Sequence, residues 1–468
     1  MLCNEIFRRA RKKILIDFSD MKKILPTCLI LSSLLLACDG GNTPKESIDM
    51  DYLLARKSVR SGYTDYSIYV YVNTKDGSEL PVEGHISLGT PFSGGFSLAI
   101  IQDENTKQKS LQYIEKNGKT LKSEATEDLF SATVFNDGRA WATKVGEFPA
   151  IIDKSGKQIK IVECDYAWPF SDGVAVTMSF DQLTIVDVNG KELARIDDKY
   201  KPLFPRFCNG VMLVKNTETG LYGAIDKKGE EVVPCIYKHI GDSYDPIKAY
   251  TSIMENMNKG KLLVADDNGW GAVDLKGRIL IPTNYSYLSI DEDLYLFQAG
   301  DLYGWLNDKG KVIIEPMFVQ AQAFNGRKMA GAMSVLNGQY VYQVIDRKGR
   351  PVNDEVYENM MAFSKRGTAV ATPFGRGTGW GVIDSKGKWL VAPEHEILWP
   401  IGDTPMYVCE LERGKYGIID EAGKICVPAA YSSIILPTAS LYRDSFSYSR
   451  STIGLYRPAA SDGSWVEE

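Results

Sequence analysis

The feature that most constrains the fold is a nine-residue unit that recurs along the chain. Its clearest copy spans residues 270–278, with the sequence WGAVDLKGR. An aromatic residue opens the unit at Tyr222, Trp270, Tyr303, Tyr342, Trp380 and Tyr416. An acid follows at Asp226, Asp274, Asp346, Asp384 and Asp420, and weaker copies keep an acid at Glu115, Asp153 and Asp187. Counting Asn307, these positions lie 33 to 48 residues apart, mostly near 38, so the chain is a tandem array.

Each unit predicts a β-hairpin. Asp226 stands at the first position of a tight turn, where its carboxylate can accept a backbone N–H, and Gly229 stands where a positive φ is favourable. The flanking residues are β-branched or aromatic, which is typical of strands. A Phe-x-x-Gly turn or a close variant recurs upstream of the units, as at residues 170–173, and a Pro-x-x-aromatic segment follows the hairpin, as at residues 234–237. We expect the proline to end strand pairing.

The strand at residue 270 is apolar on both faces. Trp270 and Ala272 share one face, and Gly271 and Val273 share the other, because side chains alternate along a strand. We therefore expect each sheet to be packed between two neighbours, with Trp270 contacting one and Gly271 allowing the other to approach closely. Glycine inside a strand costs roughly 0.5–1 kcal/mol, and burial of an aromatic side chain offsets this by about 2–3 kcal/mol.

The aromatic-Gly-x-Ile/Val-Asp-x-x-Gly-Lys unit resembles the WG-repeat family of bacterial proteins, and the Phe-x-x-Gly turn is a second feature of that family. The similar units cover about residues 80–431. Departures are Gln343 in place of the glycine, Asn307 in place of the acid, and the missing Trp-Gly of the first three copies. The resemblance implies a shared scaffold and no common ligand.

The predicted fold is all-β, with about ten units of three to four strands each. Residues 50–88 read as a degenerate first unit, and residues 453–456 echo the motif near the other end. If the two ends pair, the array closes into a propeller-like ring without free sheet edges. If they do not pair, it is an open β-superhelix. We favour the propeller-like arrangement.

Residues 1–38 read as a signal region. Met21 starts a basic segment, an apolar run covers residues 24–37, and Leu35-Leu36-Ala37-Cys38 resembles a bacterial lipobox. Cys38 is then the lipid-attachment residue, and either Met1 or Met21 is the true start. The alternatives are an ordinary signal peptide and a membrane anchor, but 14 apolar residues are too few for an anchor to span a membrane. Residues 39–49 predict a flexible tether, and residues 50–468 form the repeat domain.

Charge and composition disfavour several functions. Beyond Cys38 the chain holds 47 basic and 57 acidic residues, which argues against nucleic-acid binding. The three histidines, His85, His239 and His395, are far apart, and the cysteines show no Cys-x-x-Cys spacing. We expect no metal, no cofactor and no enzymatic activity. A disulfide between Cys409 and Cys426 stays open.

Three loops depart from the pattern. The largest spacing between units is due to residues 243–259, in which residues 246–254 predict a short helix. Residues 375–379 are Gly-rich and basic but lack the Lys-Ser/Thr of a phosphate-binding loop. Residues 291–293 are three adjacent acids without the spaced ligands of a calcium loop. We interpret all three as surface loops.

Two functions remain. The first is a lipid-anchored cell-envelope protein that binds another envelope protein without catalysis, on the periplasmic or the surface side. The second is a small-ligand or glycan binder that uses a central channel or one face, with Trp168 and Trp399 as stacking platforms.

Overall fold

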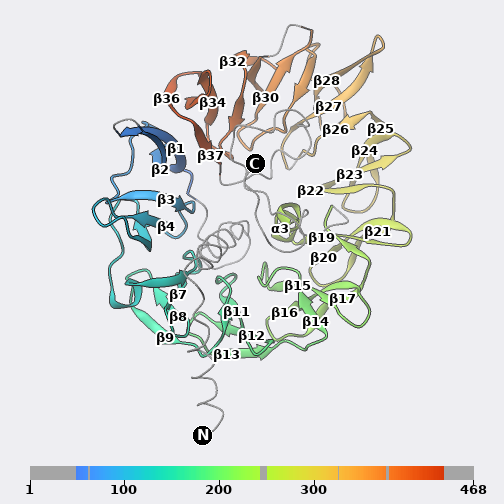
Figure 1. Cartoon of the computed structure of the whole chain (residues 1–468). Helices are drawn as coiled ribbons and strands as arrows, with labels where there is room; N and C mark the ends of the chain where they lie inside the picture. Colours follow the sequence, from blue (N-terminus) through green and yellow to red (C-terminus); the bar gives the residue numbers. More distant parts are fainter. Residues whose placement is uncertain (1–48, 62–63, 243–249, 325, 376–378, 437–468) are drawn as a thin grey trace.

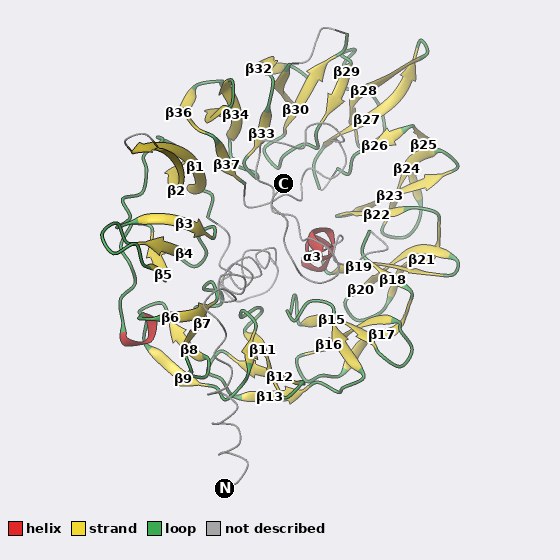
Figure 2. Cartoon of the chain, viewed as in Figure 1, coloured by secondary structure: helices red, strands yellow, loops and turns green. Residues whose placement is uncertain are grey.

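The computed structural model describes residues 49–61, 64–242, 250–324, 326–375 and 379–436. In these ranges the chain consists almost entirely of antiparallel strands, which form small sheets arranged in a ring (Figure 1). The predicted all-β, propeller-like fold is confirmed. Each sheet unit is a blade whose strands pair in chain order (Figure 2).

Five blades are separate four-stranded sheets. They are β10 (Tyr166–Ala167), β11 (Val174–Ser179), β12 (Gln182–Asp187) and β13 (Glu192–Arg195); β14 (Tyr200–Pro202), β15 (Val211–Asn216), β16 (Tyr222–Asp226) and β17 (Glu231–Tyr237); β18 (His239–Ile240), β19 (Lys261–Asp266), β20 (Gly269–Asp274) and β21 (Ile279–Tyr285); β22 (Leu288–Asp291), β23 (Leu294–Ala299), β24 (Leu302–Asn307) and β25 (Val312–Phe318); and β33 (Leu398–Pro400), β34 (Met406–Glu412), β35 (Lys415–Asp420) and β36 (Ile425–Tyr431).

Two larger sheets contain the remaining blades. The seven-stranded sheet runs through β26 (Gln320–Ala321), β27 (Met329–Leu336), β28 (Gln339–Asp346), β29 (Tyr357–Met360), β30 (Thr368–Pro373), β31 (Trp380–Asp384) and β32 (Trp389–His395). The ten-stranded sheet runs through β37 (Ser433–Ile435), β1 (Tyr52–Ser61), β2 (Thr64–Asn73), β3 (His85–Gly89), β4 (Phe96–Gln102), β5 (Lys109–Glu115), β6 (Leu129–Ala132), β7 (Arg139–Lys144), β8 (Ala150–Asp153) and β9 (Gln158–Ile161).

These larger sheets divide where two strands share a single residue pair. The divisions lie between β2 and β3, between β5 and β6, and between β28 and β29. The described chain therefore forms ten blades, three from the ten-stranded sheet, two from the seven-stranded sheet and one from each of the other five. We number them 1 to 10 in chain order, starting with β1–β2.

The ring is closed by the last described strand. Chain order places β37 after β36 of blade 10, yet β37 pairs with β1 of blade 1 through Ala55↔Ile434 and its two neighbours. The same seam is filled by a cluster in which Leu53 and Ala55 meet Ile418 and Ile434. The arrangement is thus a ring and not an open superhelix. The motif echo at residues 453–456 lies outside the described residues, and the closing strand is Ser433–Ile435.

Both faces of each motif strand are covered by neighbouring blades, as predicted. On β20, Trp270 and Ala272 pack with Leu288 and Tyr295 of blade 7. Val273, on the opposite face, packs into a cluster with residues of blade 5. The same alternation around the ring joins consecutive blades through shared apolar cores.

We expected the motif glycine to allow a neighbouring sheet to approach closely, and this prediction was wrong. A Cβ on Gly271 would lie 2.7 Å from the carbonyl oxygen of Ile281, which belongs to the outer strand of the same blade. The pairing of β20 with β21 shifts register on both sides of Ala272, so the outer strand crosses directly over Gly271. The glycine therefore makes room for its own blade's outer strand.

Blade 8 has no glycine at the motif position, and no outer strand crosses there. Gln343 occupies the glycine position, and the segment opposite, after Pro351, bends away and forms no regular strand until Tyr357. In blade 8, therefore, a side chain at the glycine position goes together with the loss of the crossing outer strand.

The prolines do not end the outer strands. β17, β21 and β36 run through Pro234, Pro282 and Pro428, and pairing resumes at the aromatic residue beyond each of them. The outer strand is the free edge of the blade, where the missing N–H of proline costs no ladder bond.

Within the described ranges, two short helices interrupt the strands. The helix η1 (Glu124–Thr126) connects β5 and β6. The helix α3 (Tyr250–Asn258) lies in the predicted insertion between β18 and β19, and residues 246–249 of the predicted helix lie outside the described ranges. Ile253, Met254 and Met257 of α3 are buried against blades 5 and 6. We expected a surface loop here, but this helix is part of the core.

Candidate functional site

The ring has two faces with different turns. On one face lie the hairpins between the first and second strands and the acid turns between the third and fourth strands, which we call the turn-acid face (for example residues 136–139 and 226–229). On the opposite face lie the hairpins between the second and third strands, which we call the tip face (for example residues 180–181 and 337–338). This follows because consecutive strands run in opposite directions.

The recurring acids bind backbone groups of their own turns. Oδ1 of Asp226 accepts hydrogen bonds from the N–H of Lys228 (2.8 Å) and of Glu230 (3.0 Å). The same two contacts, at 2.8–3.1 Å, are made by Asp153, Asp187, Asp274, Asp346, Asp384 and Asp420. In one copy the hydroxyl of Ser155 adds a third bond, which lowers the pKa of Asp153. These acids are distributed one to a blade and are not gathered into one site.

Five of the six motif aromatics pair in register with the residue that ends the outer strand of their blade, whereas Tyr342 of blade 8 pairs with Tyr357, the first residue of β29 in blade 9. The pairs are Tyr222↔Tyr237, Trp270↔Tyr285, Tyr303↔Phe318, Tyr342↔Tyr357, Trp380↔His395 and Tyr416↔Tyr431. Trp270, Tyr342 and Tyr416 are buried, and Tyr222, Tyr303 and Trp380 are half-buried. In the five blades with a motif glycine, the aromatic thus pairs with the outer strand just beyond the point where that strand crosses the glycine.

The phenylalanines of the Phe-x-x-Gly turns are completely buried in the apolar cores. Phe92, Phe135, Phe170, Phe207 and Phe324 have no exposed surface. In the turns at Asp137-Gly138 and Asp172-Gly173 both central residues have positive φ, as a tight hairpin requires. Oδ2 of Asp137 accepts the N–H of Gly173 (2.8 Å), and Oδ2 of Asp172 accepts the N–H of Gly210 (2.5 Å). Each turn therefore holds the turn of the next blade.

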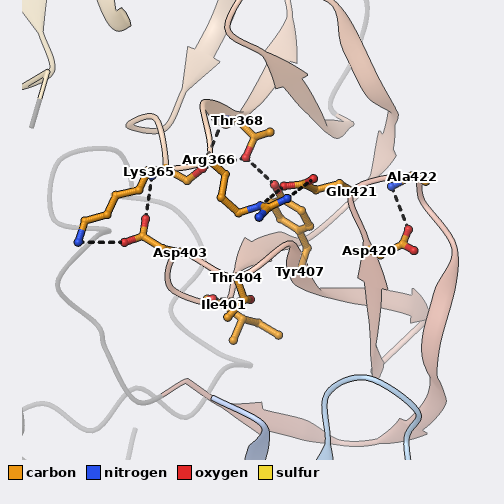
Figure 3. A network of polar contacts seen from close by, with 11 residues as sticks. Lys365, Arg366, Thr368, Ile401, Asp403, Thr404, Tyr407, Asp420, Glu421 and Ala422 are labelled. Atoms are coloured by element: carbon orange, nitrogen blue, oxygen red, sulfur yellow. Dashed lines mark hydrogen bonds and ion pairs between the residues drawn. The ribbon is translucent and has the colours of Figure 1, made fainter. Parts of the chain in front are cut away.

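A second link between blades uses the residue directly after the turn acid. Lys116 pairs with Asp49, and Lys227 pairs with Asp172, 3.2 Å away. Arg347 pairs with Asp293 at 2.5 Å. In blade 10 the two charges are exchanged: the residue after the turn acid is the acidic Glu421, and it pairs with the basic Arg366 of blade 9 (Figure 3). In each pair the partner lies in the preceding blade.

Sequence reasoning missed these pairs. The acids were interpreted through the turns alone, although the signal was present. In three of the four pairs, the residue after the turn acid carries a charge opposite to one in the first hairpin of the preceding unit; in the fourth, the partner of Lys116 is Asp49, just before β1.

Among the described contacts on the turn-acid face, the densest polar network joins blades 8, 9 and 10, and Figure 3 shows its part between blades 9 and 10. Oδ1 of Asp403 accepts the backbone N–H of Lys365 (2.9 Å), and the ammonium of Lys365 lies 3.7 Å from Oδ2. Arg327 of blade 8 approaches the same carboxylate at 3.6 Å. Beside it, Arg366 donates two hydrogen bonds to Glu421, at 2.7 and 3.0 Å. Such a bidentate pair is directional as well as strong.

A small cavity lies beneath this network. It has a volume of about 20 Å³ and is lined by Met361, Ala362, Phe363, Ser364, Thr368, Ala369, Val370, Pro400, Gly402, Asp403, Thr404 and Tyr407. The hydroxyl of Tyr407 lies 3.0 Å from that of Thr368, and burial raises the pKa of Tyr407 to about 12. This volume accommodates one water molecule and no metabolite.

The acidic loop at residues 291–293 joins neighbouring blades. Asp291 is completely buried, and its Oδ2 accepts the indole N–H of Trp305 (3.0 Å) and the backbone N–H of Phe324 (2.7 Å). Asp293 pairs with Arg347. The loop is therefore an interblade joint. Of the Gly-rich loop, residues 376–378 lie outside the described ranges.

The other predicted candidates are dispersed. His85, His239 and His395 lie on β3, β18 and β32, and within the described ranges no three His, Cys, Asp or Glu side chains form a metal-ligand group. Cys409 and Cys426 are free thiols on β34 and β36, separated by β35, so the disulfide left open by the sequence does not form.

The tryptophans considered for stacking are half-buried. Trp168 packs on the core between blades 4 and 5, and its carbonyl accepts the indole N–H of Trp141 (2.9 Å). Trp399 packs against two interblade cores.

Cys38 lies outside the described residues. Among the helices that are described, none is both long and apolar enough to cross a bilayer.

Comparisons with known proteins agree with the repeat. The family model named WG containing repeat matches residues 222–246, 270–303, 303–333 and 380–396. No curated protein matches the sequence. Similar solved structures include Hsv2 of Kluyveromyces lactis, with 10% identity, TM-score 0.25, and coverage of 54% of this chain and 94% of that one. Another is PorZ of Porphyromonas gingivalis, a surface component of its type-IX secretion system, with 9% identity, TM-score 0.24, and coverage of 81% and 65%.

Proposed function

We propose that this WG-repeat ring is a lipid-anchored protein of the cell envelope that acts as a non-enzymatic protein-interaction module. One observation carries the proposal. The repeated polar side chains are used in holding turns and blades together, and the cavity beneath the densest network has room for a single water. The broad faces of the ring are then the surfaces best suited to recognition, and surfaces of this kind fit macromolecules.

The anchor gives the ring an orientation. Asp49 is the first described residue, and its pairing with Lys116 and its backbone bond to Phe92 place it on the turn-acid face. Ten residues separate Cys38 from Asp49, and ten extended residues span at most about 35 Å. We infer that the turn-acid face lies toward the membrane and the tip face away from it.

Lipid attachment is tested by metabolic labelling. The wild-type chain should incorporate a labelled fatty acid and partition with detergent-solubilised membrane. The Cys38→Ala variant should lose the label, and a Cys38→Ala protein that still incorporates it would exclude this anchor. Cys28→Ala, a cysteine in the same segment, is the matched control and should keep the label.

The interaction role is tested by affinity purification of the full chain from solubilised envelope. We expect one protein to co-purify in a fixed ratio and to bind the purified ring directly. The glycan alternative draws on the half-buried Trp168 and Trp399, so a thermal-shift panel of envelope sugars is run in parallel. A sugar that raises the melting temperature, with the effect lost in Trp168→Ala, would replace the protein-binding proposal.

A further inference from the structure

The hairpin β27–β28 of blade 8 extends further than the corresponding hairpins beside it. Each of its strands has eight residues, whereas β23 and β24 of blade 7, and β30 of blade 9, have six, and β31 has five. The strands join through Asn337-Gly338, both with positive φ, in a two-residue turn whose twist matches that of the flanking strands. Two additional residues on each strand project the tip by about 7 Å.

The projecting end is apolar. Val335 and Tyr340 are paired across the strands and therefore share one face, with exposed fractions of 54% and 62%. Leu336, on the opposite face, is 41% exposed. Together these side chains expose on the order of 300 Å² of apolar surface, which we call the patch and which is divided between the two faces of the hairpin.

The projecting end also has open strand edges. β26 pairs with β27 only as far as Met333, and β29 meets β28 only at Tyr342. Residues 334–336 and 339–341 therefore pair with each other and with no other described strand. In an antiparallel pair, alternate residues direct their N–H and C=O groups outward. Each edge thus offers backbone donors and acceptors next to apolar side chains.

We propose that this hairpin, residues 334–341, binds an extended segment of another envelope protein by strand addition. Open backbone groups exclude lipid as the occupant, since a bilayer cannot satisfy them. The patch is too small for a stable pairing of two copies of this chain, which needs about 800 Å² from each partner. An added strand gains affinity from main-chain bonds and specificity from alternate side chains. The inference rests on the proposed interaction function and places the contact on the tip face.

The test uses the full chain with the photo-crosslinker p-benzoylphenylalanine in place of Tyr340, in its native cells. We expect one protein adduct, mapped by mass spectrometry to a stretch of alternating apolar residues. A synthetic copy of that stretch should bind the purified wild-type ring. The double substitution Val335→Ser and Tyr340→Ser should weaken this binding at least tenfold, without a change in melting temperature, because both side chains are exposed.

Val145→Ser is the matched control, since Val145 is a 76% exposed apolar residue at the tip of blade 3. It should leave peptide binding unchanged. Absence of an adduct, an adduct with lipid, or an adduct with a second copy of the chain would each contradict the inference. If affinity purification yields a partner that the double variant still binds, the interaction role stands and the hairpin assignment fails.

Discussion

Asn307 takes the place of the turn acid in blade 7 and makes the same contacts. Its amide oxygen accepts the N–H groups of Lys309 and Lys311, both at 3.0 Å. Glu115, which is one methylene longer, does not; there Asn117 accepts the N–H of Lys119. The turn thus requires an oxygen at a fixed reach, and a negative charge is not needed. The position of the oxygen, and not its charge, therefore determines whether a residue can hold this turn.

This gives a prediction for Asp226. The Asp226→Ala variant should lose about 1–2 kcal/mol of unfolding free energy, because two backbone N–H groups lose their acceptor. The Asp226→Asn variant should stay within about 0.5 kcal/mol of the wild type. Urea unfolding followed by fluorescence measures both. Equal losses in the two variants would show that the charge matters after all.

Buried tyrosines predict how stability depends on pH. Burial raises the pKa of Tyr407 to about 12, against about 10 in an unfolded chain. Folding therefore favours the neutral phenol. The stability it contributes is complete below pH 10 and is lost as the pH rises to 12. Between pH 9 and pH 11.5 the wild type should lose more unfolding free energy than Tyr407→Phe does, and identical losses would contradict this assignment.

At the scale of the strand, the motif glycine is what allows the outer strand of the same blade to cross closely over it. Gly223, Gly304, Gly381 and Gly417 repeat the crossing seen at Gly271, each with an outer-strand carbonyl oxygen 2.3–2.5 Å from an added Cβ. Blade 8, with Gln343, has no such crossing. The close approach is therefore a property of the blade and does not depend on its neighbours.

The Gly271→Ala variant should displace β21 and cost about 1–3 kcal/mol, as overpacking does. The Gln343→Ala variant should cost less than about 1 kcal/mol, since that site already holds a Cβ. Calorimetry of the two variants measures the difference. A Gly271→Ala protein as stable as the wild type would mean that the outer strand moves freely.

The ion pairs between blades are a second device at this scale. Arg366→Glu and Glu421→Arg should each lower the melting temperature, because each leaves like charges facing one another. The combined swap should recover most of the loss. No recovery in the double variant would show that the pair does not couple these blades.

The hairpins, the turn chemistry and the repeat count were predictable because each is encoded within a few residues, as in Asp226 and Gly229. The relations between strands were harder. Pairing of Tyr222 with Tyr237 depends on a register shift, and the sequence gives no sign of that shift. The burial of α3 depends on residues of blade 5 that are far from it in the chain. The register of the outer strands and the burial of α3 are therefore set by long-range packing, which a local sequence pattern does not reveal.

For the whole molecule, the closing contact is short. Only three residue pairs join β37 to β1, although a shared apolar core supports them. The Ile434→Lys variant, at a completely buried position, should open this seam and increase hydrogen exchange in β1 and β36 before other blades. Ile425→Lys, at a 55% exposed site on β36, is the control. Uniform exchange in Ile434→Lys would argue against a local seam.

The pairing of β37 with β1 also fixes the order in which the molecule can be completed. A chain that emerges from the ribosome, or is threaded through a translocase, amino end first exposes β1 long before residues 433–435 exist. At roughly 5–20 residues per second, synthesis of the intervening stretch takes on the order of 20–80 seconds. For that interval the edge of β1 that later pairs with β37 stays open, and an open strand edge is a site for pairing with other chains.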